Sequence, residues 1–250
     1  MMNSGEKRGE RSAVLSSQFT VHRSQNQRHM AKLPKFEPPR YVAIEGPIRV
    51  GKSSLAGILA ERMKAVLLRD IETNPFLESF YKDKPGAALS AQLYFLLERY
   101  KQLRELDVAA KPGRAVVSDY LFEKDKIFAY LNLSDAELEL YNSYYGLFAE
   151  QVPVPDLVIY LQAKPETLRR RLEKKNVPME HYISDEYLEE VVKAYEHFFF
   201  HYRSSSLLVV DTSEIDFIDR NEDLQELLHR LSQPVKGTQY FLPLGSASAD

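Results

Sequence analysis

The stretch YVAIEGPIRVGKSS, residues 41–54, decides the fold of this chain. Residues 41–45 form an apolar run of the kind found in buried strands. Residues 52–63 carry apolar side chains at the three- and four-residue spacing of a helix face. Between them lies the pattern G-x-x-x-x-G-K-S. A strand, a glycine-rich loop and a helix in this order predict a loop that wraps around phosphate groups.

Each part of this loop suits phosphate binding for its own reason. Gly46 and Gly51 let the backbone curl so that N–H groups face the ligand, and the helix that follows adds the positive end of its dipole. Lys52 is expected to bridge the outer phosphates of ATP, and Ser53 to ligate Mg²⁺. The loop residues predicted to bind ATP are Gly46, Pro47, Ile48, Arg49, Val50, Gly51, Lys52, Ser53 and Ser54.

The rest of the chain alternates between strand and helix patterns. Five short apolar runs are predicted strands: residues 41–45, 65–69, 115–119, 156–161 and 206–210. Strands that alternate with helices imply crossover connections and a parallel sheet that is buried on both faces. We therefore predict an α/β fold, a three-layer sandwich with a five-stranded parallel sheet. With the phosphate loop after its first strand, this arrangement is similar to folds of the P-loop kinase type.

Composition excludes several classes of protein. The 250-residue chain has no cysteine, which excludes a disulfide framework and a thiolate metal site. A net charge of −3, with no basic patch interleaved with aromatic residues, argues against a nucleic-acid partner. The apolar runs are too short to span a membrane. We expect a cytoplasmic protein that acts on small ligands.

The two ends of the chain differ from its middle. Residues 1–40 are polar and basic with few large apolar side chains, so they are predicted to be a disordered extension. A transit peptide has a similar composition, but the acidic residues in this segment count against one. Residues 233–250 contain proline and glycine and are predicted to be an irregular tail. The catalytic domain is expected to span residues 41–232.

From Tyr41 to about Ser232 the chain resembles the bacterial branch of the deoxynucleoside kinase family, which includes deoxyguanosine and deoxyadenosine kinases. The segment ETNPFLESFY, residues 72–81, is similar to the family's acidic, Asn-Pro-aromatic-Leu segment. The resemblance implies a kinase that moves the γ-phosphate of ATP onto the 5′-hydroxyl of a deoxynucleoside, with purines preferred. It also implies Mg²⁺ as the cofactor and a homodimer as the assembly.

In this family a carboxylate near the end of the second strand takes the proton of the 5′-hydroxyl, as general-base chemistry requires. Relatives usually place glutamate at or next to the positions of Arg69 and Asp70. The resemblance therefore favours Asp70 as the general base, and Glu72 is the rival. A third interpretation is that both are ordinary solvated acids of a loop.

The resemblance also assigns the groups that hold the nucleoside. Tyr81 and Glu180 match residues that bind the sugar 3′-hydroxyl, and Gln92 and Arg99 match residues that bind the base. Gln92 and Arg99 lie two helical turns apart, so both project from one face. The predicted nucleoside-binding residues are Tyr81, Gln92, Arg99, Asp119 and Glu180.

Asp119 and Tyr120 stand where eukaryotic relatives have Glu-Arg-Ser. Asp119 is expected at the carboxyl end of a parallel strand beside the phosphate loop, where it could ligand Mg²⁺ through water. The predicted metal ligands are thus Ser53 and Asp119. The departure from the family pattern removes an arginine from the acceptor site.

A second departure concerns the lid, residues 168–180. Relatives end this helix with Arg-Gly-Arg, whereas here Lys175 begins the sequence Lys-Asn-Val and is predicted to contact ATP as a point charge. Arg171 aligns with a family arginine and is predicted to be a catalytic lid contact. Arg49 stands where the bacterial branch commonly has glycine. We hypothesise that Arg49 neutralises charge on the transferring phosphoryl group; the alternative is that it points into solvent.

Two other functions stay open. One class of thymidylate kinases also has an arginine in its phosphate loop, which suggests a nucleoside monophosphate kinase, although Tyr81 and Glu180 argue against it. The departures from the family pattern suggest a degenerate, nucleotide-binding regulatory subunit, against which the intact loop with Lys52 argues. The absence of an N-K-x-D motif argues against a GTPase.

Overall fold

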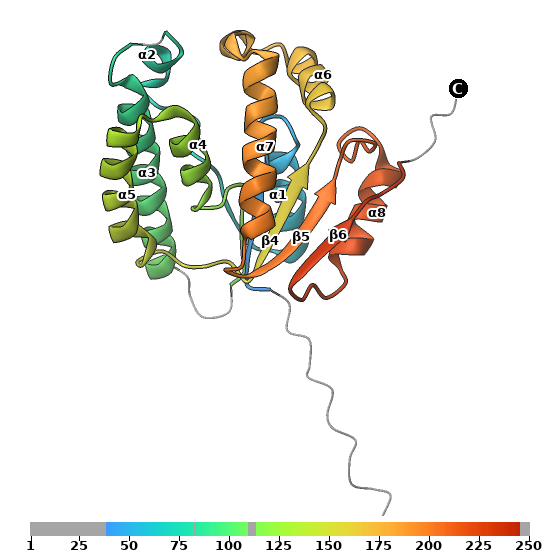
Figure 1. Cartoon of the computed structure of the whole chain (residues 1–250). Coiled ribbons are helices and arrows are strands. Elements are labelled where there is room, and N and C mark those ends of the chain that lie inside the picture. The colour runs from blue at the N-terminus through green and yellow to red at the C-terminus, as the bar shows by residue number, and fades with distance from the viewer. Residues whose placement is uncertain (1–38, 83, 110–113, 246–250) are drawn as a thin grey trace, which may run out of the picture. The chain divides into compact units, whose positions relative to one another are not determined.

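The computed structural model describes residues 39–82, 84–109 and 114–245. Within them lies one parallel sheet of six strands in the order β2-β3-β1-β4-β5-β6 (Figure 1). The strands are β1 (Tyr41–Glu45), β2 (Val66–Leu68), β3 (Val116–Ser118), β4 (Leu157–Gln162), β5 (Ser206–Asp211) and β6 (Thr238–Phe241). All five predicted strands are present, each within one residue of its predicted ends. The predicted α/β fold with a parallel sheet is confirmed.

Helices connect the strands and cover both faces of the sheet. They are α1 (Lys52–Met63), α2 (Leu77–Tyr81), α3 (Ala87–Ala109), α4 (Lys124–Asn132), α5 (Asp135–Ala149), α6 (Pro165–Lys175), the 3₁₀ helix η1 (Pro178–Tyr182), α7 (Asp185–His201) and α8 (Asn221–Leu231). In Figure 1, α7 lies in front of the sheet and α1 behind it. None of the described helices is long and apolar enough to cross a bilayer.

The core is divided by the sheet into two layers. Along β1, Val42 and Ile44 pack with the helices α1, α6 and α8. Tyr41 and Ala43 point to the other face and pack with α3, α4, α5 and α7. This alternation follows from the two-residue period of a strand. All five residues of β1 are buried, which makes it the centre of the molecule's core and a rigid base for the loop that follows.

The sixth strand corrects two predictions. The sheet has six strands where five were predicted, and β6 lies in the tail that was predicted to be irregular. Residues 207–210 of β5 pair with residues 238–241, so the tail covers an edge that β5 would otherwise expose. β6 has only four residues, half of them exposed, between proline and glycine, and such a strand gives little signal in the sequence. The predicted extension of residues 1–40 lies outside the described residues except for its last two.

Candidate active site

The phosphate loop has the curled shape that its glycines predict. Gly46 has a φ of 153°, and a Cβ atom there would lie 2.2 Å from the carbonyl oxygen of Leu161. Gly51 has a φ of 111°, and a Cβ atom there would lie 2.5 Å from the ring of Phe217. Neither position has room for a larger residue, so both glycines fix the path of the loop.

Glu45, the last residue of β1, holds the base of the loop. Its carboxylate is completely buried and accepts hydrogen bonds from the backbone N–H groups of Gly46 and Leu121, each at 2.9 Å. The hydroxyl of Tyr195 donates a third hydrogen bond at 3.0 Å. A buried carboxylate needs such partners, because an unpaired one is very costly to desolvate. Glu45 thereby joins the phosphate loop to the chain that follows β3.

The Lys52 amine folds back onto the first two residues of the loop. Its Nζ donates to the carbonyl oxygens of Gly46 at 2.6 Å and Pro47 at 3.0 Å. Burial lowers the pKa of Lys52 to about 8, although Glu45 opposes the shift. The neighbouring residues Ser53 and Ser54 are exposed in the first turn of α1. The lysine amine is therefore held at the loop by backbone oxygens, and the Ser53 side chain is accessible to solvent.

Arg171 braces this loop from α6. Its guanidinium donates to the carbonyl oxygens of Val50 at 3.3 Å, Thr212 at 2.8 Å and Ile215 at 3.1 Å, and to the Thr212 hydroxyl at 3.1 Å. Burial lowers the pKa of this guanidinium. The predicted catalytic arginine is thus engaged with the backbone of the fold, and it ties the loop to the segment after β5.

Asp70 follows β2 and lies between two cations. Arg99 holds its two oxygens through Nε at 2.8 Å and Nη2 at 3.1 Å, and Lys124 contacts the second oxygen through Nζ. Although burial raises the pKa of the Asp70 carboxyl, Arg99 and Lys124 hold it well below its usual range. Arg99 also pairs with Asp125. The structure brings the predicted general base and the predicted base-binding arginine into direct contact.

Asp119 ties the ends of β2 and β3 together. One carboxylate oxygen accepts the backbone N–H of Asp70 at 2.6 Å, and the other lies 3.5 Å from Nη1 of Arg69. The same Nη1 donates to the carbonyl oxygen of Ser53 at 2.9 Å. Asp119 is only 3% exposed. The two predicted metal ligands are therefore linked through Arg69.

The segment before α2 sets the position of Tyr81. The Asn74 amide donates to the carbonyl oxygen of Ala91 at 3.0 Å, which fastens this segment to α3. Burial raises the pKa of the Tyr81 hydroxyl, and Tyr187 and Glu180 add to the increase. Tyr81 therefore lies within electrostatic reach of Glu180, the other residue that the resemblance assigns to the sugar.

Arg49 does not point freely into solvent, as one interpretation of the sequence allowed. Its Nε and Nη2 donate to the two oxygens of Glu180 at 2.9 and 2.6 Å, and the two side chains are only 28% and 16% exposed. The backbone of Arg49 has a φ of 60°. The loop arginine and the lid glutamate thus form a two-pronged ion pair across 131 residues of sequence.

The remaining predicted residues are more scattered. Gln92 is buried on α3, seven residues before Arg99. Glu72 is exposed two residues beyond Asp70, and Lys175 is exposed at the end of α6. Glu72, Gln92 and Lys175 do not belong to the contacts described above, whereas Lys52, Asp70 and Asp119 follow the carboxyl ends of β1, β2 and β3.

With this geometry in place, comparison with known proteins is decisive. The sequence model of the family "Deoxynucleoside kinase" matches residues 42–236. The chain belongs to the deoxynucleoside kinase family. It is 34% identical to the deoxyguanosine kinase of Bacillus subtilis over 193 residues, which cover 75% of this chain and 93% of that protein. The deoxyadenosine kinase of Lactobacillus acidophilus is 26% identical over 210 residues, 78% of this chain and 96% of that one.

Solved structures agree. The deoxyadenosine kinase from M. mycoides with bound dATP superposes with a TM-score of 0.65 at 25% identity, covering 78% of this chain and all of that chain. The protein is therefore an ATP-dependent deoxynucleoside kinase with the fold of that family.

Sequence reasoning missed three charged residues of this kinase's site: Glu45, Lys124 and Asp125. Lys124 and Asp125 open α4, and their side chains are nearly inaccessible. Burial raises the pKa of Asp125 to about 6, although Arg99 and Lys124 oppose this. One oxygen of Asp125 is buried without a hydrogen-bond partner. In the sequence, Lys124 and Asp125 belong to the charged run EKDK, residues 123–126, which is typical of a solvated helix end. The position of this run just after β3 was the one feature that could have indicated a site residue.

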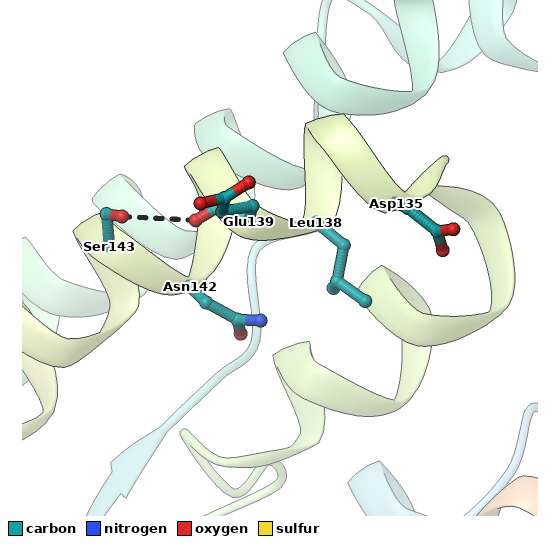
Figure 2. A pocket seen from close by; sticks show the side chains of 5 residues that line it. All are labelled: Asp135, Leu138, Glu139, Asn142 and Ser143. Carbon is teal, nitrogen blue, oxygen red and sulfur yellow. Dashed lines mark hydrogen bonds between the residues drawn. The ribbon is translucent and has the colours of Figure 1, made fainter.

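A surface hollow elsewhere on the kinase is unrelated to this site. Figure 2 shows it on α5, where the Ser143 hydroxyl donates to the Glu139 carbonyl oxygen at 3.1 Å. Its lining residues are Asp135, Leu138, Glu139, Asn142 and Ser143. None of them is a predicted site residue, so the charged cluster at the strand ends is the candidate active site.

Proposed function

We propose that this kinase transfers the γ-phosphate of ATP to the 5′-hydroxyl of a deoxynucleoside, with purine deoxynucleosides preferred. The observation that carries the proposal is the position of Asp70. Its half-buried carboxylate, 24% exposed, follows β2 at the sheet edge where the phosphate loop follows β1. A hydroxyl bonded to Asp70 would meet a phosphate held in the loop. The similarity to a deoxyguanosine kinase supports the purine preference.

We propose that ATP is bound by the phosphate loop and by residues 168–180, which form the lid. Lys52 leaves the loop carbonyl oxygens and pairs with the outer phosphates of ATP, and Lys175 adds positive charge from the lid. Arg49 neutralises the charge that develops on the transferring phosphoryl group, because preorganised cations act most strongly where charge appears in the transition state. Arg171 supports the reaction indirectly by holding the loop in shape.

The acceptor side depends on orientation more than on basicity. The low pKa of Asp70 makes it a weak proton acceptor but keeps it ionised at neutral pH. In a loose phosphoryl-transfer transition state the nucleophile needs little deprotonation before it attacks. Asp70 thus accepts a hydrogen bond from the 5′-hydroxyl, aims the oxygen at phosphorus, and receives the proton late. Glu72, which is exposed, is the weaker candidate for this role.

The remaining polar groups suit a nucleoside. Tyr81 and Glu180 hold the sugar 3′-hydroxyl, while Gln92 and Arg99 bind the base. We add Asp125, because its unpartnered buried oxygen is an acceptor beside Arg99 and would otherwise be costly. Every nucleobase carries an N–H donor on its Watson–Crick edge, so this acceptor suits base binding in general, and the purine preference rests on the similarity to a deoxyguanosine kinase.

Mg²⁺ fits the donor set around the loop. The Ser53 hydroxyl and the Asp119 carboxylate offer the oxygen ligands that this ion prefers, and substrate phosphates usually complete its shell. When bound, the ion neutralises phosphate charge and orients the γ-phosphate. Asp119 already accepts the N–H of Asp70, so it also keeps the acceptor carboxylate in register with the loop.

We propose further that the kinase is a cytoplasmic homodimer. Leu140, Tyr144 and Leu147 form a stripe along α5 and are 45%, 45% and 63% exposed. Residues three or four positions apart share one helix face. A second copy of the same stripe would cover these apolar side chains by the self-complementary contact of a two-fold dimer.

One experiment separates this function from its rivals. The protein is incubated with ATP and Mg²⁺ together with each of the four deoxynucleosides or with dTMP, and the ADP and the phosphorylated product are quantified. We expect the largest kcat/KM with deoxyguanosine or deoxyadenosine. Product from dTMP alone would support the thymidylate-kinase-like alternative, which the loop arginine favours. ATP binding with no product from any acceptor would support a regulatory subunit.

A further inference from the structure

The backbone at Arg49 is unusual for an arginine. Arg49, Lys64 and Asn176 are the non-glycine residues with positive φ in the described part of the chain. Lys64 and Asn176 are the C-caps of α1 and α6, where the left-handed conformation is common. Arg49 caps no helix; it lies inside the phosphate loop. A strained conformation at a functional loop indicates that something in the surroundings holds it there.

The ion pair with Glu180 fixes the side chain that this backbone carries. Nε and Nη2 form one edge of the guanidinium, and this edge takes both carboxylate oxygens. A guanidinium has five N–H donors, so three remain on the opposite edge and the free side of Nη2. A fork of this kind fixes the plane of the guanidinium, which a single contact would leave free to rotate. Arg49 is therefore held in one orientation with part of its donor set unused.

Glu180 occupies a place between the two halves of the site. It lies in η1, directly after the lid helix α6, and its electrostatic effect reaches the Tyr81 hydroxyl on the nucleoside side. On the other side it meets the phosphate loop through Arg49. One carboxylate is thus in contact with the loop while remaining within reach of the sugar site.

We propose that Glu180 is a positioning residue for Arg49, so that the loop arginine neutralises the transferring phosphoryl group only when the lid glutamate holds it. This rests on the proposed function, and it assigns Glu180 a second role beside sugar binding. Because Glu180 comes from the lid, transfer requires η1 to lie over the loop.

The test is a double-mutant cycle with Arg49→Ala, Glu180→Gln and the combined variant, each assayed for kcat and for the KM of the deoxynucleoside. Arg49→Ala is expected to lower kcat by about 1,000-fold, the lower end of what arginine fingers supply. Glu180→Gln is expected to lower kcat by about 100-fold, the typical cost of a displaced catalytic group. The combined variant should match Arg49→Ala in kcat, because Glu180 acts through Arg49.

The nucleoside KM gives a readout that is separate from kcat. Glu180→Gln should raise it by the same factor with and without Arg49, because the sugar contact does not depend on the arginine. A combined variant whose kcat falls by the product of the two single effects would overturn the proposal. Asp185→Asn is the control: Asp185 pairs with Arg169 at 2.5 Å, is 74% exposed, and touches neither the loop nor Glu180 in the described contacts. It should leave kcat unchanged.

A second measurement does not depend on kinase activity. The chain has no tryptophan, so Tyr182→Trp places a single tryptophan in η1, two residues from Glu180, at a side chain that is 72% exposed, and its emission can be excited apart from that of the tyrosines. In this background Arg49→Ala and Glu180→Gln should both increase acrylamide quenching to the same extent, because either change releases η1 from the loop. Unchanged quenching in both variants would contradict the ion pair. If no deoxynucleoside is phosphorylated, the proposed function is wrong. The quenching measurement still shows whether the ion pair between Arg49 and Glu180 holds η1 on the loop.

Discussion

Asp70 and Glu72 are two residues apart in the sequence and have different surroundings. Asp70 forms ion pairs with Arg99 and Lys124, whereas Glu72 is exposed to solvent. A fixed acceptor can orient a hydroxyl, and a mobile exposed one cannot do so without losing side-chain entropy. The structure thus gives a physical reason to prefer the residue that the sequence already favoured.

Asp70→Asn should therefore lower kcat, by about 100- to 10,000-fold, which is the usual contribution of a positioned acid or base. Glu72→Gln serves as the matched control and should stay near wild type. Steady-state kinetics with saturating ATP and a purine deoxynucleoside measure both. Full turnover by Asp70→Asn together with loss of turnover in Glu72→Gln would reverse the assignment.

Lys52 should make ATP binding depend on pH. Its pKa is about 8 without ATP, and bound phosphates favour the protonated amine, so binding should take up protons between about pH 8 and 9.5. ATP affinity should accordingly fall as the pH rises above 8. Calorimetry in two buffers of different ionisation enthalpy measures the uptake at pH 8.5. Lys52→Arg keeps its charge throughout this range, and uptake that persists in this variant would exclude Lys52 as the source.

The same pKa has a consequence for stability. The folded value lies below the ordinary lysine value of 10.5, so the unfolded chain binds more protons between pH 8 and 10.5. The cost of burying this cation is fully present below pH 8 and is relieved as the pH rises through that window. Burial of the Lys52 cation therefore lowers the free energy of unfolding at neutral pH, and it leaves a charged amine in the loop where phosphate is proposed to bind.

At the scale of elements, α6 and the phosphate loop depend on Arg171. Arg171→Ala would leave the backbone carbonyl oxygens of Val50, Thr212 and Ile215 without this donor. We expect a loss of about 2–4 kcal/mol in the free energy of unfolding. The KM for ATP should rise, because the loop loses its brace. Arg49→Ala should instead lower kcat with little change in stability, so thermal denaturation combined with kinetics distinguishes the two arginines.

The strand β6 should also contribute to stability, because it covers an edge of the sheet. Deletion of residues 233–250 removes the backbone partner of β5, and the exposed edge is expected to lower the melting temperature and promote aggregation. Deletion of residues 246–250 keeps β6 and is the control. Differential scanning fluorimetry and light scattering report both effects. Equal melting temperatures for the two truncations would show that β6 contributes nothing to stability.

For the whole molecule, the stripe on α5 predicts an assembly. Leu147→Glu places a charge in the proposed dimer contact and should give monomers in size-exclusion chromatography with light scattering. Leu244→Glu is the control, since Leu244 is 95% exposed and follows β6 in the chain rather than belonging to α5. A dimer that survives Leu147→Glu would place the interface elsewhere, and a wild-type monomer would refute the proposed assembly.

How far the sequence could be interpreted depended on the range of each interaction. The loop and its glycines are local patterns, and so is the capping box of Ser134 and Glu137 at the start of α5. Parallel strands with continuous apolar runs were equally clear. The contacts between Arg49 and Glu180 and between Arg99 and Asp125 join distant segments, and no local period marks them. Lys124 and Asp125 were missed because a charged helix start looks the same whether it is solvated or buried.

The left-handed backbone of Arg49 sets two selective pressures against each other. Glycine is the residue that this conformation favours, since it has no Cβ to oppose a φ of 60°. Arginine is the residue that the proposed chemistry favours. A library randomised at this position and sorted only for thermal resistance should therefore accumulate glycine, while sorting for growth on a salvaged deoxynucleoside should retain arginine. The arginine found at position 49 would then indicate that selection for turnover outweighed selection for stability at this position.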